Sequence, residues 1–424
     1  MNHYQNHDFF YYLRRGHGRA YLMLRYETDD EKRREYRDAV IYACLHDQRL
    51  DPQIFFERDL YLWDMISLFP DRDDIVADIL RRAAIDLPQE LSYWDFQHRT
   101  DVLQQLKTQG YADAEAVLNR YYDTLLDFLR SRTDVPPCLD EDMQKMTSLA
   151  SRLGKPMPDL GQDPLPTLEE WKAKHKATPH PAPPKTVEEL IGALREGFSL
   201  PRCRKKLQSL TEKEIRQVAD AALAEEDFVA RAQLFSAFAV VDYPYDPEPL
   251  LEVARGNLDG WDKIDEDFKA YQRFLQPHRA LSRIRHPAVR EYAEWLLATF
   301  PAETRWNTGL EILVRNYIPD DRDRILTWRK NSITSEMEGN TVWGTVWHAI
   351  DSSIVEAAKA DPHRFDPDFF PMIYYTSLCS NERCDAFRIM ESLGMLTPVM
   401  LEEGVHDSED RLQKRAKELL HYKT

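Results

Sequence analysis

Apolar residues recur at spacings of three and four along most of the chain, and this periodicity limits the fold more than any other feature. Such spacing places apolar side chains on one face of an α-helix. It is clear in YRDAVIYACLHD, LYLWDMISLF, DIVADILRRAAI, DAEAVLNRYYDTLLDFL, EIRQVADAALAEE, FVARAQLFSAFAVV and VWGTVWHAIDSSIVEAA. Sequence signals for β-strands are nearly missing. No Asn-Gly pair occurs, and the single Asp259-Gly260 pair is not flanked by alternating apolar residues. We therefore predict an all-α fold.

Prolines gather in one region of the chain. Ten of the 25 prolines fall between Pro136 and Pro184. Each ring removes a backbone donor and disfavours helical geometry at the preceding residue, so KATPHPAPPKT cannot sustain a helix. We therefore expect a helical block at 1–135, a proline-rich linker at 136–185 and a second helical block at 186–424.

The stretch RHPAVREYAEWLL can be read as a site or as a structural helix. Proline at a first helical position costs no hydrogen bond, so a helix is expected to begin at Pro287. Arg290, Glu291 and Glu294 would then point to water. The opposite face would carry Val289, Tyr292, Ala293, Leu296, Leu297 and Phe300.

The same skeleton recurs near the C-terminus, in SEDRLQKRAKELL and more loosely in RCDAFRIMESLG. Each copy follows another helical stretch and a short turn with Asp, Asn or Pro. The pattern resembles the HEAT-like family of α-helical repeats, most clearly over 265–300 and 366–421. That resemblance implies stacked antiparallel helix pairs that form an α-solenoid, whose extended surface binds a protein or peptide.

Several helix starts can be read from the sequence. TVEEL offers Thr186 as an N-cap with Glu189 at the third helical position. LFPDRDDIVADIL and YIPDDRDRILTW share a proline followed by an acidic first turn, and a divalent-metal site is the alternative to capping there. The aspartates concerned are Asp71, Asp73, Asp74, Asp320, Asp321 and Asp323.

Charge and cysteine content limit the class of protein. The net charge of -17 argues against a general nucleic-acid or membrane-surface binder, although a local basic patch is compatible with it. Five widely spread cysteines suit free thiols in a reducing compartment. No stretch has eighteen consecutive apolar residues and no signal peptide is evident, so we expect a cytoplasmic protein.

Motifs that carry chemistry are absent or weak. The sequence has no nucleophile elbow, phosphate-binding glycine loop, dinucleotide fingerprint or zinc-protease helix. Cys379 and Cys384 lack a second ligand pair for zinc, so buried thiols are the expected reading. Cys44 and His46 diverge on a helix, which argues against a thiolate-imidazole pair. We expect no metal and no cofactor.

Two basic stretches offer a weak alternative of phosphate or nucleic-acid binding. RRGHGRAY contains Arg14, Arg15 and Arg19, and its Gly16 is expected to end a short helix or to let two helices approach. The second stretch, RCRKK, contains Arg202, Arg204, Lys205 and Lys206. The expected environment of both basic sets is a solvated helix surface.

Trp343, Trp347 and Asp351 lie one turn apart in WGTVWHAID, so a carboxylate would stand beside two indoles. This helix looks like a distant analogue of HEAT-like DNA glycosylases that hold an alkylated purine on tryptophans beside an aspartate. Val342, Val346 and Ile350 make the adjoining face apolar, which favours burial of the whole helix between neighbours.

Two functions therefore remain open. The expected one is a non-catalytic scaffold that binds a protein or peptide on an α-solenoid surface, since it requires no catalytic motif. The alternative is a HEAT-like nucleic-acid binder or glycosylase-like enzyme, with Trp343, Trp347 and Asp351 as its site.

Overall fold

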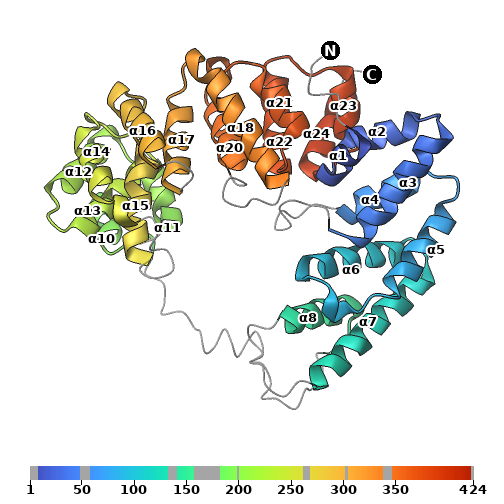
Figure 1. The fold of residues 1–424 in the computed structure, drawn as a ribbon. Coiled ribbons are helices and arrows are strands. Elements are labelled where there is room, and N and C mark those ends of the chain that lie inside the picture. The colour runs from blue at the N-terminus through green and yellow to red at the C-terminus, as the bar shows by residue number, and fades with distance from the viewer. Residues whose placement is uncertain are drawn as a thin grey trace. The chain divides into compact units, whose positions relative to one another are not determined.

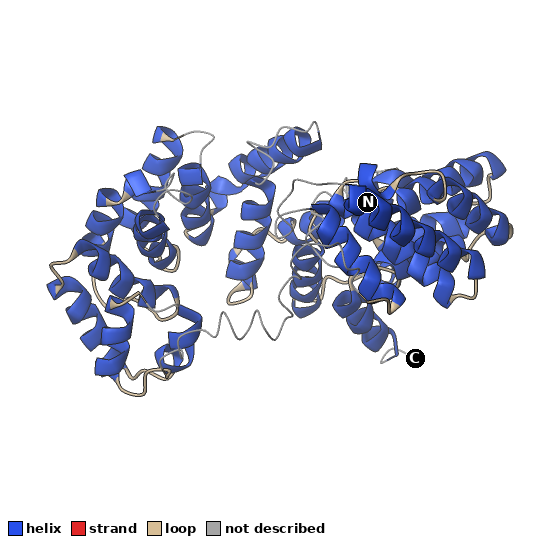
Figure 2. Ribbon diagram, turned by 90° about the horizontal axis from the view of Figure 1, so that it is seen from below, coloured by secondary structure: helices blue, strands red, loops and turns tan. Residues whose placement is uncertain are grey.

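The computed structural model describes residues 8–47, 58–131, 141–156, 182–197, 200–260, 268–300, 304–337 and 346–421. Within these ranges the chain forms 22 α-helices and no strand, which confirms the predicted all-α class. Figure 2 shows helices joined by short loops throughout the coloured parts. Among the described helices, none has the length and apolar character that a bilayer-spanning segment requires.

The chain divides into two compact units. Unit 1 consists of residues 1–177 together with 370–424, and unit 2 consists of residues 178–369. This division differs from the expected second block at 186–424, because the last helices of the chain pack with the first ones. Part of the expected linker at 136–185 is helical, since Glu141–Leu153 forms α8. Residues 157–181 lie outside the described residues.

Unit 1 combines helices from both ends of the sequence, coloured blue to teal and red in Figure 1. Helix α2 packs against α23, and α6 packs against α4, α7 and α8. The helices from the N-terminal part are α1 (Phe9–Arg15), α2 (Gly18–Tyr26), α3 (Asp30–Leu45), α4 (Arg58–Ile66), α5 (Arg72–Ala83), α6 (Tyr93–Thr108), α7 (Ala112–Ser131) and α8. Those from the C-terminal part are α21 (Phe369–Thr376), α22 (Ser380–Ser392), α23 (Pro398–Val405) and α24 (Asp410–His421).

Unit 2 is built from helices that pack mostly against the next described helix or the one after it. Helix α16 packs against α17, and α20 packs against both α17 and α18. The α-helices are α10 (Val187–Arg195), α11 (Leu200–Gln208), α12 (Glu212–Ala224), α13 (Phe228–Phe235), α14 (Glu248–Gly256), α15 (Phe268–Leu281), α16 (Pro287–Thr299), α17 (Thr304–Arg315), α18 (Arg322–Met337) and α20 (Val346–Ala358). Short 3-10 segments include η3 (Ser236–Ala239), η5 (Pro319–Asp321) and η6 (Pro362–Arg364).

Helix starts follow the sequence closely. Helix α10 begins with a complete capping box, in which Thr186 and Glu189 accept each other's backbone N–H groups. Helix α16 begins at Pro287, as predicted. The apolar face predicted for α16 is buried at Val289, Tyr292, Ala293, Leu296 and Leu297, whereas Phe300 is half-buried.

The expectation that Arg290 faces water is wrong. Its guanidinium donates to both carboxylate oxygens of Asp321 at 2.7 Å, and the Asp321 side chain is only 3% exposed. Asp321 also accepts the backbone N–H of Ile318 at 3.0 Å. The acidic turn before α18 therefore caps its own backbone and binds an arginine of an earlier helix, and these contacts explain why an aspartate stands there.

The same kind of pair recurs in unit 1. Arg37 of α3 donates to Asp71 at 3.1 Å, just before α5, and Asp71 makes no capping hydrogen bond with its side chain. Arg383 of α22 donates to Asp407 at 2.8 Å, just before α24. In each case an arginine on one helix binds an aspartate in a later inter-helix turn.

Replacing Arg290 with alanine is expected to lower the free energy of unfolding by about 1–2 kcal/mol, because two charge-assisted hydrogen bonds to a buried carboxylate are lost. The control is Glu291→Ala on the exposed face of the same helix, for which a change within about 0.5 kcal/mol is expected. Thermal melts of the two variants measure the difference. Equal melting temperatures would contradict the pairing of Arg290 with Asp321.

Candidate functional site

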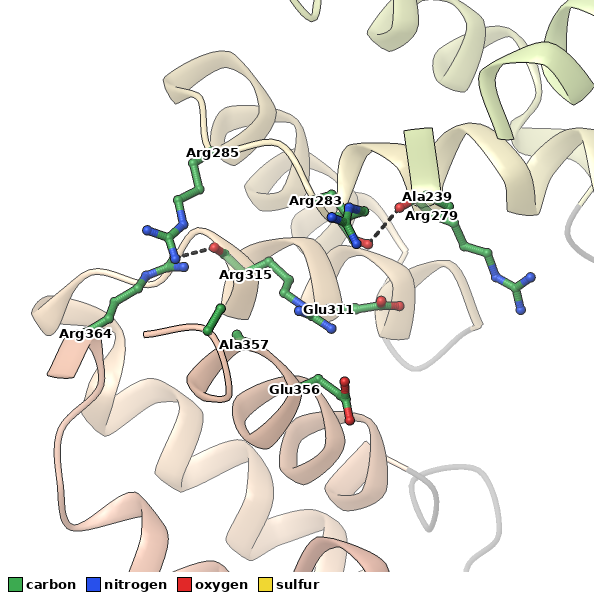
Figure 3. A pocket seen from close by; sticks show the side chains of 11 residues that line it. Ala239, Arg279, Arg283, Arg285, Glu311, Arg315, Glu356, Ala357 and Arg364 are labelled. Atoms are coloured by element: carbon green, nitrogen blue, oxygen red, sulfur yellow. Dashed lines mark hydrogen bonds between the residues drawn. The ribbon is translucent and has the colours of Figure 1, made fainter. Parts of the chain in front are cut away.

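Unit 2 contains a cleft of about 430 Å³ that we call the arginine cleft. It lies where α15, α17 and α20 end, so its walls come from segments far apart in the sequence. Figure 3 shows its side chains, with Arg285 and Arg364 extending toward each other near Arg315. The arginines that line it are Arg279, Arg283, Arg285, Arg315 and Arg364.

Helix termini explain part of this concentration of positive charge. The last carbonyl groups of a helix lack partners within the helix and carry negative partial charge, which favours cations there. Arg364 donates to the backbone carbonyl of Arg315, the last residue of α17. Arg279 lies in the last turn of α15. The local chain geometry thus brings guanidinium groups to one place.

Burial and neighbouring positive charges act on two of these guanidinium groups. Burial, together with the nearby charges of Arg285 and Arg315, lowers the pKa of Arg364 to about 10. Burial also lowers the pKa of Arg315, against the attraction of Glu311 and Glu356. Glu311 and Glu356 are the acidic residues that line the cleft, so the arginines outnumber them.

One donor in the cleft lacks a partner. The Nε of Arg315 is buried and makes no hydrogen bond among the described residues. A buried N–H without a partner is costly, and an acceptor from a bound ligand removes that cost. The cleft therefore has the features of a site for an anionic group: excess positive charge, partial burial and an available donor.

A second cavity of about 440 Å³ adjoins the first, and we call it the tyrosine pocket. Arg283 and Arg285 line both cavities. The tyrosine pocket is further lined by Asp242, Tyr243, Tyr245, Asp246 and His286. The hydroxyl of Tyr243 is buried and has no hydrogen-bond partner within the described part of the chain.

Trp347 and Asp351 are both buried in unit 2. Trp347 is 5% exposed and Asp351 is fully buried. Asp351 accepts two hydrogen bonds from the buried Arg329, from Nε at 2.5 Å and from Nη2 at 2.8 Å. Trp343 lies outside the described residues. The predicted alternative site is therefore, at its two described positions, part of the core of unit 2.

The glycines of RRGHGRAY allow a close approach between the two ends of unit 1. Gly16 ends α1 with a φ of 65°, as predicted for a helix end. A Cβ added to Gly18 would lie 1.7 Å from the carbonyl oxygen of Glu403. The backbone N–H of Ser408 donates to Gly16 at 2.8 Å. Because these glycines have no side chain, the backbone between α1 and α2 can lie directly against the end of α23 and the turn that follows it.

The arginines of this segment are not on a solvated surface, which corrects the expectation. Arg19 forms an ion pair with Glu403 at 2.7 Å, and burial raises the pKa of Glu403 to about 7. Arg15 is buried with its guanidinium 3.4 Å from the ring centre of Tyr11. His17 is fully buried, so its pKa is well below the usual range. The ion pair of Arg19 with Glu403 joins the N-terminal and C-terminal helices of unit 1.

The other sequence candidates have structural roles. Burial raises the pKa of Cys44 and Cys379 to about 12 and of Cys384 to about 11, so these thiols are protonated and poor nucleophiles. In the basic run of α11, Arg202, Arg204 and Lys205 are exposed. Lys206 pairs with Glu214 at 3.1 Å. This run is a solvated helix surface, as expected.

The arginine cleft was not found from the sequence, because its residues come from three separate helix ends. One sequence feature points to the cleft: in SRIRHP, Arg283 and Arg285 precede the proline that starts α16. Arginines just after the end of a helix favour a helix cap or an anionic ligand. Arg315 and Arg364 are isolated in the sequence and carry no such signal.

No protein-family model, no curated protein and no solved structure matches this chain.

Proposed function

We propose that this chain is a non-catalytic scaffold of HEAT-like helical repeats that binds an acidic segment of a partner protein in the arginine cleft. The observation that carries the proposal is the cleft itself. A chain with a net charge of -17 places five arginines around one partly buried cavity, and burial together with the charges of Arg285 and Arg315 lowers the pKa of Arg364 there. An acidic ligand removes that repulsion, whereas the unliganded protein must retain it.

Two further features support the scaffold part of the proposal. The recurring pairs Arg37 to Asp71, Arg290 to Asp321 and Arg383 to Asp407 fit a repeated helix-turn-helix unit that stacks into an α-solenoid. In such arrays the surface formed by successive repeats is the usual binding surface. The buried cysteines in the described residues are all free, which fits a cytoplasmic location.

The proposal is tested with a fluorescein-labelled, glutamate-rich peptide and the full chain. The anisotropy titration is expected to show saturable binding that weakens as salt increases. Arg285→Gln is expected to weaken binding by about tenfold, because one charge-assisted contact is worth roughly 1.4 kcal/mol. The same variant is expected to keep the melting temperature of the unmutated protein, since Arg285 is exposed and its loss relieves repulsion on Arg364.

The matched control is Arg204→Gln, which removes the same charge from an exposed position on α11. This variant is expected to bind the peptide like the unmutated protein. Equal binding by all three proteins would show that the peptide responds to overall charge or to another surface, and the proposed cleft would be rejected.

A further inference from the structure

The two adjoining cavities in unit 2 differ in charge, because five arginines and two glutamates line the first, whereas two aspartates balance the two shared arginines in the second. The arginine cleft has an excess of guanidinium groups, and the tyrosine pocket adds Asp242 and Asp246 beside them. Both carboxylates are on exposed residues. Arg283 and Asp242 approach to only 3.5 Å, and the Asp242 side chain is 92% exposed, so this pair neutralises little of the charge. A ligand that covers both cavities therefore has an excess of arginines around one part and two additional carboxylates beside its neighbouring part.

The arginine cleft suits a phosphoryl group better than a carboxylate. A phosphate monoester carries a charge of about -1.5 to -2 and three strong acceptor oxygens. A carboxylate carries one charge on two oxygens and is satisfied by one bidentate arginine. Arg285, Arg315 and Arg364 line the same cavity, and Arg364 donates to the backbone carbonyl of Arg315. Three neighbouring guanidinium groups match the larger charge and the greater number of acceptors.

The tyrosine pocket suits a cationic neighbour of that group. Asp242 and Asp246 attract a lysine or arginine side chain. The buried hydroxyl of Tyr243 offers an oxygen that has no partner among the described residues, and it can accept a hydrogen bond from an ammonium or guanidinium group. Because Arg283 and Arg285 border both cavities, the cation and the anion must lie on neighbouring parts of one ligand.

A nucleic-acid strand fits this arrangement poorly. A strand that covers both cavities would place a second phosphate beside Asp242 and Asp246, where the carboxylates repel it. The ring of Tyr243 contacts those of Phe238 and Phe235 edge-on, at centroid distances of 4.8 and 6.0 Å. That ring is already engaged with the core, which limits its use as a platform for stacking bases.

We propose that the partner segment is a phosphorylated peptide whose phosphoryl group binds Arg285, Arg315 and Arg364, and whose adjacent basic side chain binds Asp242 and Asp246. This inference rests on the proposed function and specifies its ligand. It assigns the tyrosine pocket a role in selecting the residue beside the phosphorylated one.

The test uses the immobilised full chain and two degenerate peptide libraries of equal length. One library has a fixed central phosphoserine, and the other has glutamate at that position. Mass spectrometry identifies the retained peptides. The phosphoserine library is expected to be retained at least about tenfold better, because additional charge-assisted hydrogen bonds form. Lysine and arginine are expected to be enriched next to the phosphoserine.

Variants separate the two cavities. Arg285→Gln is expected to reduce retention of the phosphoserine library. The double variant Asp242→Asn with Asp246→Asn is expected to keep that retention and lose the enrichment of basic residues. Glu252→Gln on the exposed face of α14 is the control and is expected to behave like the unmutated protein.

Each result decides between the two proposals. Equal, Arg285-dependent retention of both libraries would overturn the phosphopeptide inference and leave the acidic-partner function standing. Retention of phosphoserine without enrichment of basic residues would also overturn the inference. Failure to retain either library would reject the proposed function as well. Arg285-dependent binding of a labelled single-stranded oligonucleotide in preference to the phosphoserine library would replace the peptide by nucleic acid.

Discussion

Replacement of Asp351 with asparagine is expected to destabilise the protein by about 3 kcal/mol or more, because the buried Arg329 loses its carboxylate partner. Arg329 is 3% exposed and Asp351 is fully buried, so water cannot replace the lost charge. The sequence places Asp351 one turn from Trp347, and the structure pairs its carboxylate with Arg329. A thermal melt or a denaturant titration of the full chain measures the loss.

Two further variants separate this ion pair from a general effect of charge. Asp323→Asn removes a carboxylate that is 89% exposed, at the start of the helix that carries Arg329, and a change within about 0.5 kcal/mol is expected. The double variant Arg329→Met with Asp351→Leu is expected to be less destabilised than Asp351→Asn, because it removes the buried guanidinium together with the carboxylate. An Asp351→Asn protein as stable as the Asp323→Asn protein would contradict the buried pair.

Gly18→Ala is expected to destabilise unit 1 by roughly 3 kcal/mol, at the upper end of the cost of overpacking a well-packed site. The new Cβ would lie 1.7 Å from the carbonyl oxygen of Glu403 and 2.7 Å from its carbonyl carbon. These are backbone atoms, so the clash cannot be relieved by a change of side-chain rotamer. Helix α2 must separate from α23, and that movement also strains the ion pair of Arg19 with Glu403.

The matched control is Gly192→Ala in α10, where an added Cβ meets nothing within 4 Å. Because glycine in a helix costs roughly 0.5–1 kcal/mol relative to alanine, this variant is expected to be slightly more stable than the unmutated protein. The two glycine variants should therefore shift the melting temperature in opposite directions. A Gly18→Ala protein that melts with the unmutated one would show that α2 and α23 do not approach so closely.

The sequence predicted local structure well, because local structure depends on neighbouring residues. The start of α16 at Pro287 and the capping box of Thr186 follow from the preferences of a few adjacent residues. The burial of Val289 and Leu296 follows from helical spacing. Arg290 fits the same helical pattern as a surface residue, but its partner Asp321 is 31 residues away. Periodicity carries no information on such a pair.

The division of the chain and the candidate site depend on contacts between distant segments. Nothing near Glu403 in the sequence indicates that it meets Arg19, and that contact helps to join 370–424 to the N-terminal helices. The arginine cleft forms because α15, α17 and α20 end at one place, which brings Arg285, Arg315 and Arg364 together. Trp347 and Asp351 formed the most conspicuous sequence motif, and both are core residues.

Hydrogen exchange of the full chain, with and without a saturating acidic peptide, tests the central proposal most directly. Binding in the arginine cleft is expected to slow exchange at the ends of α15, α17 and α20, over 279–285, 311–315 and 356–364, and to leave 202–206 of α11 unchanged. At a peptide concentration near the Kd of the unmutated protein, the slowing should be much smaller in Arg285→Gln, because this variant is expected to bind about tenfold more weakly. Protection confined to α11 or to unit 1, with none at the three helix ends, would contradict the assignment of this cleft as the binding site.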